Sequence, residues 1–133
     1  LTASGGPFLR RSADTFSHIR PEEALHHPRW EMGPRITVDS ATMMNKGFEV
    51  IEAAWLFGLD RGQIEVVVHP ESIIHGLVSY VDGNTQACLS VPDMRAPIAY
   101  ALAVEAGMHR LPSEVSTLDL TKVKSLTFEP IDF

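Results

Sequence analysis

The spacing of hydrophobic and polar positions along the chain predicts helices and strands in mixed order. Residues 35–38 alternate like a short strand, and Asp39 and Ser40 then offer an N-cap for the clearest helix. This helix is predicted from residue 41 to residue 56 or 59, with Gly58 as its C-cap. Its apolar side consists of Met44, Phe48, Ile51 and Trp55.

The rest of the chain lacks regular alternation of strand and helix. The other predicted elements are a short helix over about 21–27, a strand over 63–69, a turn over 70–75, a hairpin of 77–81 and 85–91, a helix over 94–106, a loop over 111–119 and a last strand over 125–128. The fold class is therefore α+β, a mixed β-sheet with helices packed on one face. Residues 1–35, rich in Gly and Pro, are expected to form a long, mobile active-site loop at the N-terminus; a disordered arm is the alternative.

Length and charge narrow the classes of protein. The 133 residues fit one domain, and no apolar run approaches the roughly 20 residues of a membrane span. A net charge of −6 argues against nucleic acid and anionic membranes as partners. Residues 1–46 nevertheless carry +1 and residues 47–133 carry −7, so the front of the chain is the part that could receive a small anion. The chain does not begin with Met or a signal peptide, and we expect it to be a piece of a longer protein.

A polar stripe on the long helix is the main candidate for chemistry. Asn45, Glu49 and Glu52 follow at helical spacing with Lys46 alongside, and Ser40 is expected at the N-cap. An amide, an ammonium, a hydroxyl and free N–H groups suit a phosphate, and Glu49 could hold a cation. The alternative is an ordinary solvated face with a Lys46–Glu49 or Lys46–Glu52 ion pair.

The N-terminal loop adds weaker candidates. Ser4, followed by Gly5 and Gly6, could give a hydroxyl to the same anion, although Ser-Gly-Gly turns are common. His27 could donate to a ligand and Trp30 could cover it, or Trp30 could simply anchor the loop. The chain contains no Walker loop, no Gly-x-Gly-x-x-Gly and no complete metal-binding motif.

These segments resemble the 1-deoxy-D-xylulose 5-phosphate reductoisomerase family over nearly the whole chain. The most specific match is Ser-Ala-Thr-Met-Met-Asn-Lys-Gly at residues 40–47. Further matches lie at residues 1–8, 27–30, 32–33, 69–75 and 92–95, with Ala3 where the family often has Gly. The resemblance implies an enzyme that rearranges and reduces 1-deoxy-D-xylulose 5-phosphate to 2-C-methyl-D-erythritol 4-phosphate for isoprenoid synthesis, with NADPH and Mg²⁺ or Mn²⁺.

The same resemblance implies roles for individual residues. Glu49 and His27 would be catalytic, with Glu49 also the metal ligand, and Gly33 would lie near the nicotinamide cofactor. The substrate would be held by Ser4, His27, Trp30, Ser40, Asn45, Lys46 and Glu49.

The resemblance also sets what the chain is expected to lack. Residues 1–133 would be part of the central catalytic and dimerisation domain of a homodimer, without the NADPH-binding and C-terminal helical domains, and inactive alone. The expected location is the bacterial cytoplasm, or the plastid stroma if the source is a plant or alga. The alternatives are a non-catalytic phosphate-binding or dimerisation module derived from that enzyme, and an unrelated soluble α+β domain.

Overall fold

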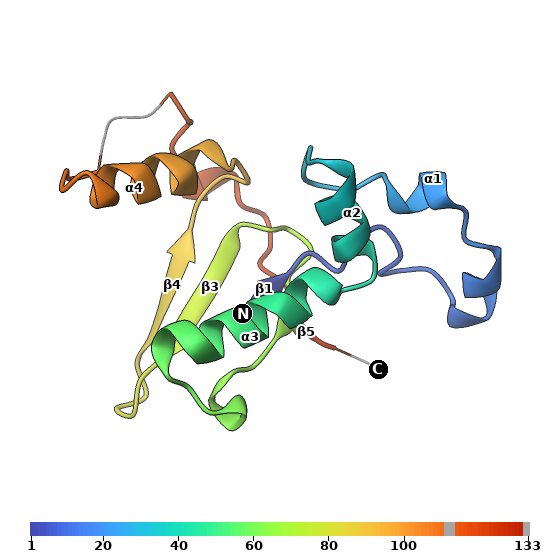
Figure 1. Ribbon diagram of the computed structural model, residues 1–133, viewed down its shortest axis with the longest axis horizontal. Coiled ribbons are helices and arrows are strands. Elements are labelled where there is room, and N and C mark those ends of the chain that lie inside the picture. The colour runs from blue at the N-terminus through green and yellow to red at the C-terminus, as the bar shows by residue number, and fades with distance from the viewer. Residues whose placement is uncertain (111–113, 132–133) are drawn as a thin grey trace.

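The computed structural model describes residues 1–110 and 114–131 (Figure 1). The strands are β1 (Thr2–Ala3), β2 (Val67–Val68), β3 (Ile74–Ser79), β4 (Thr85–Leu89) and β5 (Glu129–Pro130). The α-helices are α1 (Pro21–Ala24), α2 (Pro34–Ala41), α3 (Met44–Phe57) and α4 (Arg95–Glu105). Three short 3₁₀ helices complete the elements: η1 (Ala13–His18), η2 (Arg61–Gln63) and η3 (Leu120–Lys122).

The strands form two sheets, where one mixed sheet was predicted. β2 is the centre of a three-stranded sheet, parallel to β1 and antiparallel to β5. β3 and β4 form a separate antiparallel hairpin whose turn contains Gly83 at φ 88°. Figure 1 shows α3 crossing in front of β3, while α4 lies near the end of β4 and α1 on the opposite side. The α+β class is confirmed, and the two sheets meet through β1 and β3, where the Thr2 hydroxyl donates to the Ile74 carbonyl at 2.7 Å.

The predicted strand over 35–38 is wrong, because these residues lie inside α2. Pro34 occupies the first helical position, where its fixed φ favours a helix and its missing N–H costs nothing. Thr37, 2% exposed, donates from both its backbone N–H and its hydroxyl to the Gly33 carbonyl. These contacts outweigh the strand preference of the β-branched residues.

Most of the other predicted elements are confirmed with different bounds. α1, the hairpin and α4 are present, and Gly58 ends α3 in the left-handed conformation at φ 62°. The strand over 63–69 is reduced to β2, preceded by η2. The predicted strand over 125–128 is wrong, because the Thr127 N–H and carbonyl bond the side chains of Glu71 and His69, and β5 begins only after this segment. Of the loop predicted over 111–119, residues 111–113 lie outside the described residues, and 114–119 contain no helix or strand. Residues 1–35 contain β1, η1 and α1, so they are less loop-like than predicted.

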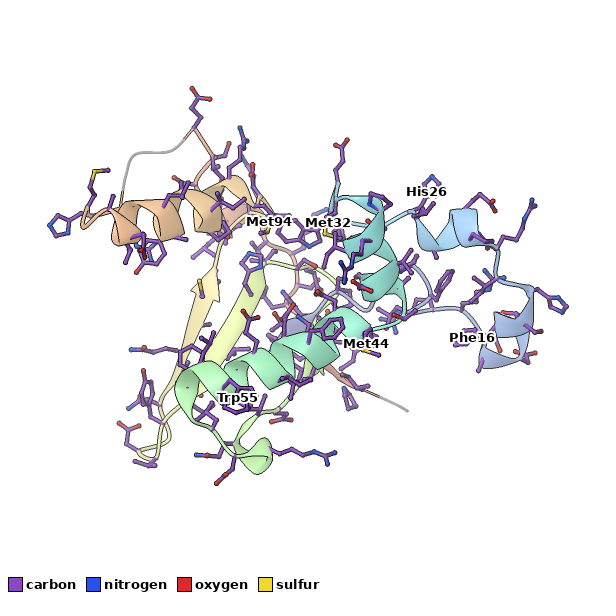
Figure 2. All side chains as sticks on the ribbon, viewed as in Figure 1. Phe16, His26, Met32, Met44, Trp55 and Met94 are labelled. Carbon is purple, nitrogen blue, oxygen red and sulfur yellow. The ribbon has the colours of Figure 1, made fainter. Side chains whose placement is uncertain are left out.

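The apolar side of α3 faces outward. Phe48, Ile51 and Trp55 are 53%, 58% and 85% exposed, and Figure 2 places Met44 and Trp55 at opposite ends of this helix. The whole chain exposes 10176 Å², whereas a free-standing monomer of 14.7 kDa is expected to expose about 6,900 Å². The three exposed side chains of α3 contribute to this excess.

A buried imidazole and a carboxylate in the turn before β3 bind the segment that leads into β5. His69, fully buried, donates from Nδ1 to the Thr127 carbonyl at 2.8 Å and stacks on Phe128. Its Nε2 accepts the Ile73 N–H, so the tautomer is fixed. The Glu71 carboxylate accepts from the hydroxyls of Ser125 and Thr127 at 3.0 and 2.5 Å.

Replacing Glu71 by Gln is expected to reduce stability in a pH-dependent way. Burial opposes its ionisation, but hydrogen bonds from Thr127, Ser125 and its own backbone lower the pKa of Glu71 from 4.5 to about 2. A lowered acid pKa stabilises the fold above about pH 4.5, and this stabilisation, at most roughly 3 kcal/mol, is lost as the pH falls toward 2. Urea unfolding at pH 7 and pH 3 measures this loss of stability, and Glu65→Gln, at an exposed position, is the control. An equal pH dependence of the free energy of unfolding in wild type and Glu71→Gln would contradict the prediction.

Candidate functional site

Three side chains predicted to form the anion site meet on α3. The Asn45 amide donates to Glu49 Oε1 at 2.9 Å, and Lys46 Nζ donates to Glu49 Oε2 at 2.6 Å. The three groups therefore converge on one point, as the helical spacing predicts. Glu52, the fourth polar position of the predicted stripe, is exposed on the same helix.

The cluster differs from a solvated helix face. A Lys46–Glu49 ion pair is present, as in the alternative interpretation of the sequence, but the Lys46 side chain is only 13% exposed and that of Glu49 35%. The positive charge of Lys46 also reaches a neighbouring side chain, because it adds a smaller effect to burial in lowering the pKa of His75. A partly buried ammonium with such neighbours favours an anion beside it.

The predicted N-cap at Asp39 and Ser40 is wrong. Both residues lie in the last turn of α2, and α3 begins at Met44 after Met43, whose backbone is left-handed at φ 61°. The Met43 side chain caps no N–H of α3, and the Thr42 hydroxyl accepts the Met44 N–H at 3.4 Å. The Met43 N–H donates to the Ser40 carbonyl at 3.1 Å, which folds the chain sharply between the two helices. Ser40 therefore lies beside the start of α3 without capping it.

The Ser-Gly-Gly turn packs directly on this bend. Gly6 is buried at φ 68°, and a Cβ atom placed on it would lie 2.8 Å from the Ser40 carbonyl oxygen and 3.2 Å from the Ala41 Cα. Only glycine allows this main-chain contact. The sequence predicted the members of the turn but not this contact, which brings Ser4 and Ser40 to the same side of the molecule.

Ser4 and His27 form a hydrogen-bonded pair across 23 residues of sequence. His27 Nδ1 accepts the backbone N–H groups of Trp30 and Arg29 at 2.9 and 3.1 Å, so the ring proton is on Nε2. Nε2 then donates to Ser4 Oγ at 2.9 Å, and Gly6 N–H donates to the same oxygen at 3.3 Å. The proton of the Ser4 hydroxyl is left free to donate to an acceptor such as a phosphate oxygen.

The loop held by His27 is expected to loosen in mild acid. Burial lowers the pKa of His27 below its ordinary 6.5, and a second ring proton would remove the acceptor of the Trp30 N–H. A lowered histidine pKa stabilises the native contacts above pH 6.5, and this is lost as the pH falls through the native pKa. Hydrogen exchange should show the Trp30 amide losing protection at pH 5 relative to pH 7.5. This pH-dependent loss of protection should be absent in His27→Gln. A protection factor of the Trp30 amide that is the same at both pH values in the wild type would contradict the prediction.

Trp30 lies over the loop and against the hairpin. Its indole is 6.0 Å from the His75 ring, centroid to centroid, a contact that the sequence did not predict because nothing in it relates the loop to β3. A hollow of about 360 Å³ borders this loop, and His27, Trp30 and Met32 are among its lining residues. A larger hollow of about 560 Å³ lies elsewhere, along residues 117–125, and none of the predicted site residues lines it.

The remaining predictions concern cofactor and metal. Gly33, expected near the nicotinamide, is the exposed N-cap of α2. Among residues 1–110 and 114–131, no three His, Cys, Asp or Glu side chains are grouped as metal ligands. Glu49 alone does not meet the octahedral oxygen demand of Mg²⁺, so these residues do not hold a complete metal site. Within the same residues, no helix is long and apolar enough to cross a membrane.

Comparison with known proteins agrees with the resemblance noted in the sequence. Residues 1–57 match the family described as the 1-deoxy-D-xylulose 5-phosphate reductoisomerase C-terminal domain, and residues 89–133 match the DXP reductoisomerase C-terminal domain. The 1-deoxy-D-xylulose 5-phosphate reductoisomerases of Chlorobium phaeobacteroides (strain BS1) and Janthinobacterium sp. are 58% and 56% identical. They cover 99% and 100% of this chain, which spans 34% and 33% of their lengths.

Solved structures give the same result. A DOX-P reductoisomerase in complex with NADPH, fosmidomycin and magnesium has a TM-score of 0.92 at 52% identity, over 99% of this chain and 32% of its own. The Zymomonas mobilis 1-deoxy-D-xylulose 5-phosphate reductoisomerase in complex with NADPH has a TM-score of 0.85 at 43% identity, over 99% and 33%.

Sequence and fold therefore both point to one family of proteins. The chain belongs to the 1-deoxy-D-xylulose 5-phosphate reductoisomerase family and spans about one third of the length of its relatives.

Proposed function

We propose that this chain supplies the substrate-phosphate site of an enzyme converting 1-deoxy-D-xylulose 5-phosphate to 2-C-methyl-D-erythritol 4-phosphate. The convergence of Asn45, Lys46 and Glu49 at the start of α3 carries the proposal. A half-buried ammonium and an amide donor suit a phosphate. Ser4 adds a hydroxyl whose proton is free, and Ser40 lies on the neighbouring bend.

The residues of the loop would orient and enclose the substrate. His27 fixes the Ser4 hydroxyl through Nε2 and is proposed to contact the substrate as well. Trp30 would cover the substrate and exclude water from the reactive aldehyde. Binding energy from the phosphate, which does not react, can be used to close the loop and align the reacting carbons.

Glu49 is the one carboxylate that we propose this chain contributes to a divalent metal. NADPH and magnesium occur in the solved relative, and the same cofactors, with Mn²⁺ as the other metal, are proposed here. When bound, the metal would polarise the ketone and hydroxyl oxygens of the substrate. The other metal ligands have to come from outside the described residues. Gly33, at the start of α2, is proposed to lie near the nicotinamide.

Residues 1–133 are proposed to be part of the central catalytic domain and to be inactive alone. A polypeptide with the full length of the relatives should oxidise NADPH only when 1-deoxy-D-xylulose 5-phosphate and Mg²⁺ or Mn²⁺ are present. The 133-residue chain should show no turnover in the same assay. Turnover by the 133-residue chain would refute the proposal that its metal site is incomplete. Absence of turnover by the full-length polypeptide would refute the proposed activity.

The second candidate is a non-catalytic phosphate-binding or dimerisation module. The exposed surface of the hairpin favours a role in assembly, because all five residues of β4 are exposed. Within the described chain β4 pairs with β3 along one edge, and its other edge pairs with no strand. We propose a homodimer in either case. The named relatives are bacterial, which favours the cytoplasm of a bacterium over the plastid stroma.

A further inference from the structure

Glu49 binds two of the donors of the proposed anion site, Asn45 and Lys46. One carboxylate oxygen accepts from the Asn45 amide and the other accepts from Lys46 Nζ. Both carboxylate oxygens are therefore hydrogen-bonded to these two groups. The carboxylate lies where a phosphate would have to bind.

The burial of the pair strengthens this arrangement. The Lys46 side chain is 13% exposed, so its ammonium has lost much of its hydration and depends on a counter-ion. Glu49 is the only acid within salt-bridge distance of Lys46 in the described chain. His75, whose pKa also responds to Lys46, does not supply negative charge to it.

A phosphate on Lys46 would meet the charge of Glu49. Two anions held by one ammonium lie a few ångströms apart, where like charges repel strongly at low effective dielectric. The phosphate must therefore displace Glu49 from Asn45 and Lys46, or bind with this repulsion unrelieved.

We infer that Glu49 is an internal competitor of the phosphate for Asn45 and Lys46. This inference rests on the proposed function, since it concerns the same site. It assigns to Glu49 a role in the binding of a phosphate or phosphate monoester that is separate from any role toward a metal. The site would therefore bind a free phosphate weakly, despite having the donors for it.

Binding of inorganic phosphate without metal tests the inference. Isothermal titration calorimetry on the protein and its Glu49→Gln variant should give phosphate affinity about fivefold higher in the variant, the effect of removing an ion pair of ordinary strength. Glu52→Gln is the matched control, because it removes the same charge from the same helix. We expect its affinity to stay within about twofold of the wild type.

Further variants separate the possible outcomes. Glu49→Asp, which retracts the carboxylate by one methylene, should tighten phosphate binding to a smaller degree and serves if Glu49→Gln does not fold. Equal affinities for the wild type and both Glu49 variants would overturn the competition but leave the anion site standing. Phosphate binding that Lys46→Met does not weaken, or no binding by any variant, would overturn the anion site and the competition together. An equal gain in Glu52→Gln would reduce the effect to net charge and also overturn the inference.

Discussion

Replacing Lys46 by Ala is expected to lower kcat/KM for 1-deoxy-D-xylulose 5-phosphate by roughly 10- to 150-fold. The change would remove the charge-assisted hydrogen bond that we propose Lys46 donates to the substrate phosphate, worth about 1.5–3 kcal/mol. Lys46 is held at a fixed place on α3, where its side chain is mostly buried against the cluster, so no other ammonium of the described chain replaces it. Steady-state kinetics of NADPH oxidation by the full-length enzyme measures the loss.

Lys122→Ala is the control for the charge. Lys122 also pairs with an acid three residues away, Asp119, but both side chains are exposed. We expect this variant to keep kcat/KM within about twofold, because exposed pairs contribute little. Similar losses in the two variants, or unchanged kinetics in Lys46→Ala, would remove Lys46 from the site.

Replacing Gly6 by Ala is expected to destabilise the protein by roughly 2–4 kcal/mol. The left-handed backbone of an L-residue costs about 1–2 kcal/mol, and the new methyl group meets the Ser40 carbonyl oxygen at 2.8 Å. Because that oxygen belongs to the backbone of α2, the contact is relieved only by moving the helix or the Ser-Gly-Gly turn. Chemical unfolding measures the change, and KM should rise as Ser4 is displaced.

Gly83→Ala separates the two parts of this effect. Gly83 has φ 88°, but no atom lies within 4 Å of its added Cβ, so only the backbone cost of about 1–2 kcal/mol applies. The difference between the two variants measures the crowding at Ser40. If both lose the same free energy, the close approach of the turn to α2 has no energetic weight.

Some elements of the fold could be predicted from the sequence, and others could not. α3 and the hairpin follow from regular spacing of apolar residues and from the Asp82-Gly83-Asn84 turn. α2 could not, since Ile36, Thr37 and Val38 favour a strand locally. The helix forms because Pro34 begins it and Thr37 is buried against the Gly33 carbonyl.

The candidate site divides in the same way. The convergence of Asn45, Lys46 and Glu49 follows from one helix, so spacing alone predicts it. The bend at Met43 has no signal in the sequence, because methionine rarely adopts a left-handed backbone. The Ser4–His27 bond depends on the path of 22 intervening residues, which no local pattern determines.

The hydrogen bonds around Ser4 also select the kind of ligand that the turn can receive. Its oxygen already accepts from His27 Nε2 and from the Gly6 N–H, so little lone-pair capacity remains for a third donor. An incoming ammonium or amide N–H would therefore find little acceptor capacity there, while an acceptor oxygen can receive the hydroxyl proton. The turn therefore selects hydrogen-bond acceptors over donors. High salt would not weaken this selectivity as it weakens the attraction of an anion to a lysine.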